Sequence, residues 1–151
     1  MKNAIILAAV VLVVIIGAVL IFVRGGQGPA AISSPAVSPS PLSEITVQMT
    51  ADNNSGETGT AILKAEGAQT KVIISAVGFT QGVSQASHIH AGSCGPVGGA
   101  VKYPLSAIVN GQAETTINVS LTDLLAQLPL YVNMHRSTTD FTQVSCGNIT
   151  K

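Results

Sequence analysis

The chain has no tryptophan, and aromatic residues make up only 3% and charged residues only 9% of its 151 positions. A core built on large aromatic side chains is therefore excluded, and the expected core is aliphatic. No internal repeat is visible. Histidine and cysteine are also rare, with three and two copies. Each of these five positions is therefore informative about the chemistry of the chain.

Positive charge is scarce in the C-terminal part of the chain. From residue 44 onward, five basic residues stand against seven acidic ones, a net charge of −2, and no basic stripe is visible. Nucleic acid is therefore not an expected partner, and the net charge does not draw small anions toward the domain. Ser87 and Ser93 have no carboxylate-supported base nearby in the sequence. No catalytic residue is predicted, and the sequence names no protein partner.

A long apolar run is present near the start of the chain. Residues 4–23, AIILAAVVLVVIIGAVLIFV, carry no charge and as a helix span about 30 Å, the hydrocarbon thickness of a bilayer. We predict a transmembrane helix over 4–23 within a membrane anchor, 1–24, with the lipid bilayer as its partner. A cleaved secretory signal is the alternative, but its apolar region usually covers about 7–15 residues and ends at small residues. In either case the rest of the chain is exported.

The composition changes twice after this run. Residues 25–43, GGQGPAAISSPAVSPSPLS, are rich in Gly, Pro and Ser and predict a linker. One folded domain is expected over 44–151. Cys94 and Cys146 are an even pair in an exported domain and predict a disulfide, which persists only in an oxidising compartment. The domain is therefore expected outside the cytoplasm, in a single-pass protein of the cell membrane.

Apolar and polar residues alternate with period two from Glu44 onward, which predicts β-strands. The pair Asn110-Gly111 is typical of a tight hairpin turn, and Ser120 begins a capped short helix that ends at Pro129. Seven or eight short strands with frequent turns predict an all-β sandwich with one short helix. The strands are expected at 45–50, 58–65, 71–77, 87–90, 101–109, 114–119, 130–135 and 143–149.

The three histidines fall in two of these strands. His88 and His90 are separated by one residue, so on a strand both imidazoles point to the same face while Ile89 points to the core. His135 ends another strand and offers a third ligand. Imidazole nitrogens suit copper and zinc, and copper binds such sites most tightly among the common divalent ions. The alternative is structural: a His-x-His pair on a strand is also stable when solvated or when bonded to a loop.

Two segments resemble secreted Cu/Zn superoxide dismutases. The string His88-Ile89-His90-Ala91-Gly92-Ser93-Cys94 is similar to the copper-site strand and following loop of that family. The string Ser145-Cys146-Gly147-Asn148-Ile149 is similar to its last strand, and Gly56–Ala61 to an upstream one. The resemblance implies an immunoglobulin-like Greek-key β-sandwich, a bridge between the two cysteines, and three copper ligands at His88, His90 and His135.

The chain resembles the CHRD domain at least as closely. The similar features are His88-Ile89-His90, Leu105 after a Gly-rich loop, the helical turn Leu121–Leu125, and the strand Tyr131-Val132-Asn133-Met134-His135. Together the two resemblances cover about residues 44–149 and imply the same sandwich fold.

The departures from the dismutase pattern narrow the expected function. No histidine lies between His90 and His135, so the ligand that bridges copper to zinc and the other zinc ligands of that family are absent. No zinc is therefore expected. Gln143 stands where the family has an arginine that guides its anionic substrate, so efficient dismutation is not expected; Arg136, beside His135, is a candidate substitute charge.

Three functions stay open on the sequence. The first is a membrane-anchored, extracytoplasmic domain that binds copper through His88, His90 and His135 without zinc. The second is a non-catalytic structural or binding module of CHRD type that holds no metal. The third is a copper-dependent superoxide dismutase, the one hypothesis of the three in which the domain is an enzyme. Fold resemblance does not decide among them, because function lies in the site.

Overall fold

A computed structural model describes residues 42–96 and 98–151. The predicted transmembrane helix, 4–23, lies outside the described residues, as does nearly all of the predicted linker. Within the described part, no helix has both the length and the apolar character needed to cross a membrane. The fold described below is that of the predicted domain.

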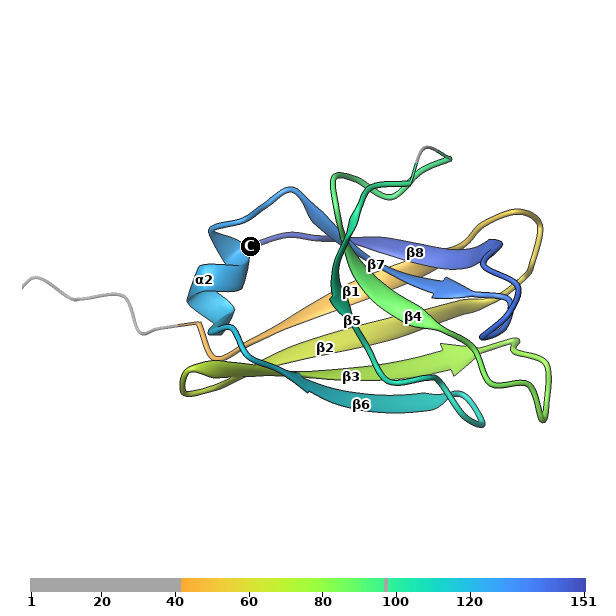
Figure 1. Cartoon of the computed structure of the whole chain (residues 1–151), viewed down its shortest axis with the longest axis horizontal. Coiled ribbons are helices and arrows are strands. Elements are labelled where there is room, and N and C mark those ends of the chain that lie inside the picture. Colours follow the sequence, from red (N-terminus) through yellow and green to blue (C-terminus); the bar gives the residue numbers. More distant parts are fainter. Residues whose placement is uncertain (1–41, 97) are drawn as a thin grey trace, which may run out of the picture. The chain divides into compact units, whose positions relative to one another are not determined.

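Eight strands and one short helix make up the domain (Figure 1). All paired strands run antiparallel, in the order β5-β4-β7-β8-β1-β2-β3-β6. The elements are β1 (Glu44–Ala51), β2 (Thr58–Glu66), β3 (Gln69–Val77), β4 (Ser87–Ala91), β5 (Val101–Pro104), β6 (Gln112–Ile117), α2 (Leu121–Leu125), β7 (Leu130–His135) and β8 (Gln143–Ile149). The predicted all-β class with one short helix is confirmed.

The strands form a single, nearly closed, barrel-like sheet (Figure 1). Strand β1 joins the two halves, since it pairs with β2 along most of its length and with β8 at Thr50 and Ala51. Strands β5 and β6 are the two edges. Near them, the backbone N–H of Ser106 donates to Thr115 Oγ1 over 2.7 Å, so the open seam is partly bridged.

The strand predicted over 101–109 is present only over its first four residues. Strand β5 ends at Pro104 and pairs with β4, whereas β6 pairs with β3. Pro104 is still paired with His88 although it has no N–H to donate, and the Leu105 N–H donates to the Ser87 carbonyl oxygen over 3.1 Å. The predicted turn at Asn110-Gly111 is present, with φ of 49° and 78°, but it closes only an isolated bridge between Val109 and Gln112.

The core is aliphatic, as the lack of tryptophan predicts. It is filled by fully buried side chains from both halves of the sheet, including Leu63, Ile74 and Ile89. Helix α2 packs against one end of this core through its three leucines. Ser120 Oγ accepts the backbone N–H of Asp123 over 3.1 Å, which caps the helix as predicted. This rigid core holds β4 and β7 side by side beneath the histidines.

Gly147 lets β8 approach β1 closely. A Cβ atom at this position would collide with the carbonyl oxygen of Gln48 and lie 2.8 Å from Val47 Cγ1. We expect Gly147→Ala to lower the free energy of unfolding by about 1–3 kcal/mol, the usual cost of overpacking. Gly95→Ala is the control, because nothing lies within 4 Å of its added Cβ. Urea unfolding of both variants tests this, and equal stabilities would contradict it.

Candidate metal centre

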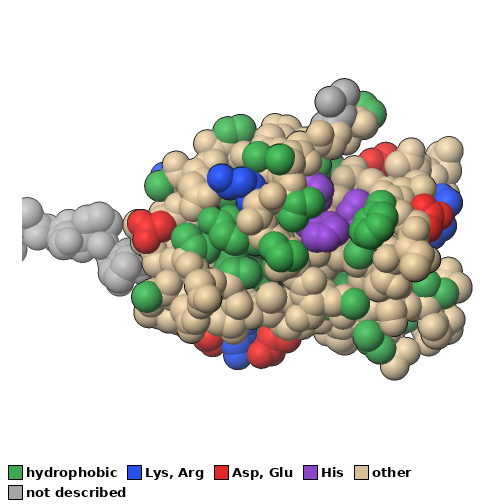
Figure 2. Space-filling model, viewed as in Figure 1, with side chains coloured by type: hydrophobic (Ala, Val, Ile, Leu, Met, Phe, Trp, Pro, Cys, Tyr) green, Lys and Arg blue, Asp and Glu red, His purple; other side chains and the backbone are tan. Residues whose placement is uncertain are grey.

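The three histidines lie on neighbouring strands. Strands β4 and β7 pair antiparallel, with His88 opposite Asn133. His88 is half-buried and His90 buried, while Ile89 between them is fully buried in the core, as the alternation predicts. His135 ends β7 just after a register shift against β8. Figure 2 shows histidine side chains reaching the surface together beside hydrophobic side chains.

The ring nitrogens of these histidines converge. Nδ1 of His88 lies 3.1 Å from Nε2 of His135. One ring nitrogen from each of the three residues lies within 4.8 Å of the others. Two ligands bonded at about 2.0–2.1 Å to one ion are separated by about 3–4 Å, so the group is close to the geometry of a shared ion. The sequence-predicted convergence of His88, His90 and His135 is thus present in the structure.

Backbone carbonyls fix the tautomers of two rings. His90 Nδ1 lies 2.8 Å from the carbonyl oxygen of Gly99, and His135 Nδ1 lies 2.7 Å from that of Phe141. A carbonyl oxygen only accepts, so each Nδ1 carries the proton and each Nε2 presents a lone pair. This is the usual arrangement of ligating histidines, whose second nitrogen is held by an outer partner.

The Nε2 atom of His90 is the most informative atom of the group. It is buried and has no hydrogen-bond partner. A buried lone pair without a partner is costly, and such exceptions in folded proteins call for an explanation such as an ion or a water. The residues present therefore fit a metal ion, with His90 Nε2, His135 Nε2 and His88 Nδ1 as its ligands.

The imidazoles of His88 and His135 are biased toward their neutral forms. Burial lowers the pKa of His88, and the two neighbouring histidines lower it further. Burial also lowers the pKa of His135, although its bond to the Phe141 carbonyl opposes part of this effect. Neutral imidazole is the form that binds a metal, so both rings are prepared as ligands at neutral pH.

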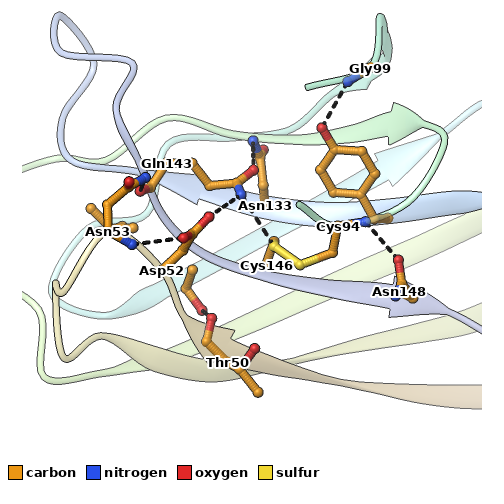
Figure 3. Close-up of a disulfide and its surroundings, with 12 residues drawn as sticks. Thr50, Asp52, Asn53, Cys94, Gly99, Asn133, Gln143, Cys146 and Asn148 are labelled. Atoms are coloured by element: carbon orange, nitrogen blue, oxygen red, sulfur yellow. Dashed lines mark hydrogen bonds between the residues drawn. A yellow bond between two sulfur atoms is a disulfide. The ribbon is translucent and has the colours of Figure 1, made fainter. Parts of the chain in front are cut away.

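Gly99, in the glycine-rich loop between β4 and β5, contacts the ring of His90. The ring of Tyr131 stacks on that of His90, with centroids 5.0 Å apart. Tyr131 Oη also accepts the backbone N–H of Gly99 over 3.1 Å, and it is the carbonyl of Gly99 that orients His90. The disulfide predicted between Cys94 and Cys146 is present and ties this loop to β8 (Figure 3).

A polar pocket of about 260 Å³ opens beside the histidines. Its wall includes His90, His135, Asn133, Gln143 and Asp52. These polar side chains are linked in series. Gln143 Nε2 donates to Asp52 over 2.7 Å, and Asn133 Nδ2 donates to Gln143 Oε1 over 3.1 Å (Figure 3). The same Asn133 nitrogen lies 3.2 Å from His135 Nε2. The pocket is therefore linked to a candidate ligand by hydrogen bonds.

Sequence reasoning missed several residues of this site. Asp52 falls between the strands predicted over 45–50 and 58–65, and Tyr131 and Asn133 fall within the strand predicted over 130–135. One signal for Asn133 was available, since it lies two residues before His135 and so shares its face of β7. Arg136, the candidate substitute charge, is paired with Asp140 at 3.1 Å and does not line the pocket.

Comparison with known proteins agrees with these features. The family model of the CHRD domain matches residues 39–142, which include all three histidines and Cys94. No curated protein and no solved structure matches the chain. The match covers more than half of the chain and spans the strands that carry the site. The chain therefore belongs to the CHRD domain family.

Proposed function

We propose that this CHRD domain binds one copper ion through His88, His90 and His135, outside the cytoplasm, on a chain anchored to the membrane by residues 4–23. The observation that carries the proposal is the buried, unpartnered Nε2 of His90 beside two other converging imidazoles. The disulfide supports an oxidising location. The length and apolar character of residues 4–23 support the anchor.

Copper is the ion that best suits this ligand set. All three ligands are neutral imidazoles, and within the described residues no cysteine or carboxylate joins the group. Among the common divalent ions, copper binds nitrogen ligands most tightly. No second histidine group is available to hold zinc beside it, because the chain has only three histidines.

We also propose that the fold is a Greek-key arrangement related to the superoxide dismutase-like sandwich. The order β5-β4-β7-β8-β1-β2-β3-β6 supports this, since the connections from β3 to β4 and from β6 to β7 each join strands that lie in different halves of the sheet. Dismutase activity itself gains no such support. Among the described residues that line the pocket there is no lysine or arginine to attract superoxide.

A metal-free structural module is the second candidate. It is favoured by the 3.1 Å contact between His88 Nδ1 and His135 Nε2, which a single proton on His88 also satisfies. In that reading, the two rings hold β4 and β7 together by a hydrogen bond. It leaves the Nε2 atom of His90 without a partner, which is why we favour the metal.

Copper titration of the full-length protein, purified in detergent with its disulfide intact, tests the proposal. We expect one Cu(II) per chain by calorimetry, with nitrogen hyperfine structure in the electron paramagnetic resonance spectrum. His88→Ala and His135→Ala are each expected to weaken copper binding about a hundredfold. Loss of a group that only orients a ligand already costs ten- to a hundredfold in metal affinity, and these substitutions remove a ligand itself.

Controls separate binding from folding. Gln48→Ala removes an exposed nitrogen-bearing side chain from β1 and is expected to leave copper binding unchanged. His88 is half-buried, so its replacement perturbs the core less than that of His135. Weak binding that ignores both histidine substitutions would favour the structural module. Tighter binding of zinc than of copper would contradict the choice of metal.

A further inference from the structure

The pocket beside the three histidines has an acidic wall. Among the described residues that line it, the charged side chain is Asp52. Arg136, which follows His135 directly in the chain, is exposed and paired with Asp140. An anion entering the pocket would therefore meet a carboxylate and no compensating positive side chain.

Hydrogen bonds hold this carboxylate in place. One oxygen of Asp52 accepts the backbone N–H of Asn53 over 2.7 Å, and the other accepts Gln143 Nε2 over 2.7 Å. Gln143 is itself held by Asn133, whose Nδ2 lies 3.1 Å from Gln143 Oε1. These hydrogen bonds together restrain the position of the Asp52 carboxylate.

The same network fixes the amide orientations near the histidines. Because Gln143 directs its nitrogen at Asp52, its oxygen faces Asn133, and Asn133 must direct its own nitrogen at both Gln143 and His135. The carbonyl oxygen of Asn133, which is buried, is left without a partner. Because this oxygen is buried, it is not offered to the pocket, and the Asp52 carboxylate is the charged acceptor in the wall.

We propose that this pocket is a binding site for small neutral, hydrogen-bond-donating molecules at the metal, and that Asp52 weakens the binding of small anions there by offsetting part of the ion's positive charge. The inference rests on the proposed copper site, whose open side the pocket would form. A volume of about 260 Å³ accommodates a molecule of a few heavy atoms. The proposed ligands are neutral, whereas superoxide is an anion.

Exogenous ligands added to the copper-loaded, full-length protein test this selectivity. Azide serves as the small anion, and imidazole at pH 8 as the neutral donor. Each is titrated by its effect on the copper electron paramagnetic resonance spectrum, for the wild type and for Asp52→Asn. We expect the substitution to tighten azide binding roughly fivefold, the order expected for one nearby carboxylate at intermediate dielectric, and to change imidazole binding less than twofold.

A remote carboxylate provides the matched control. Glu44→Gln removes one negative charge from an exposed ion pair with Lys64 on β1 and β2 and should leave both ligands unaffected. Affinities are taken from the copper-loaded fraction, so that altered loading does not enter. Equal changes for azide and imidazole in Asp52→Asn, or no change for azide, would overturn the selectivity while leaving the copper site standing. Failure of the wild type to bind copper would overturn both.

Discussion

Replacement of both cysteines by serine, C94S/C146S, is expected to lower the free energy of unfolding by about 4 kcal/mol. The disulfide joins residues separated by 52 positions. Closing a loop of that length lowers the conformational entropy of the unfolded state, which raises the free energy of that state by about 4 kcal/mol. The loss is comparable to the whole stability of many small domains. Urea unfolding of the oxidised wild type and of the double variant measures it.

The same variant is expected to weaken copper binding at least tenfold. The bridge anchors the loop that carries Gly99, whose carbonyl oxygen holds the Nδ1 proton of His90. The Cys94 backbone N–H also donates to Asn148 Oδ1 over 2.7 Å, a bond that depends on the same anchoring. Loss of an outer partner of a ligating histidine commonly costs ten- to a hundredfold in metal affinity.

Ser93→Ala is the control for this loop. Ser93 is exposed and adjacent to Cys94, so its replacement should change neither stability nor copper affinity. Copper binding has to be compared in low urea, where the double variant is still folded. A double variant that loses less than about 1 kcal/mol and binds copper like the wild type would show that the loop holds its position without the bridge.

The strand pattern was predictable because alternation is a local signal. Val47 and Met49 in β1, or Val72 and Ile74 in β3, each point inward and are buried. The same signal failed at 101–109, where alternation continues past Pro104 although the chain leaves the sheet. Pairing partners are chosen by the whole fold, and a local pattern carries no information on whether β5 meets β4 or β6.

The histidines were predictable, but their surroundings were not. His88 and His90 reveal a shared face through a spacing of two, and the Cys94–Cys146 bridge follows from there being two cysteines. Asp52 and Gln143, in contrast, are 91 positions apart in the chain. Asp52 belongs to no recognisable motif, and Gln143 stands out in the sequence only because it replaces the arginine of the dismutase pattern. Contacts of this kind arise only when β1 and β8 become neighbours, so the acidic wall and its consequence for ligand charge come from the structure.

Copper affinity is expected to be nearly constant above about pH 7 and to fall as the pH drops below the ordinary histidine pKa of about 6.5. Each ligand must be neutral to bind the ion, so protons compete with copper once the histidines begin to titrate. Burial lowers the pKa of His88 and of His135 below the ordinary value of 6.5. The fall therefore begins below pH 6.5, at lower pH than for a peptide with exposed histidines.

The same shifts set the pH dependence of the metal-free protein. A histidine whose pKa is lower in the folded state binds fewer protons there than in the unfolded chain, wherever the pH lies between the two values. Stability therefore rises with pH in that window. Above about pH 6.5 neither state holds the proton and the effect of these two residues vanishes. The metal-free domain is thus expected to lose stability as the pH falls below 6.5, and urea unfolding at several pH values measures this.

The slope of copper affinity against pH distinguishes the metal site from the structural module. In the acid limit, three ligating histidines give a slope approaching three in the logarithm of the affinity, because three protons are displaced for each ion bound. His135→Ala should reduce the limiting slope to about two, while Gln48→Ala should leave it at three. Calorimetric titrations between about pH 4.5 and pH 8 provide the slope. Equal slopes for the wild type and for His135→Ala would mean that His135 does not bind the ion, which is incompatible with a site built from His88, His90 and His135 together.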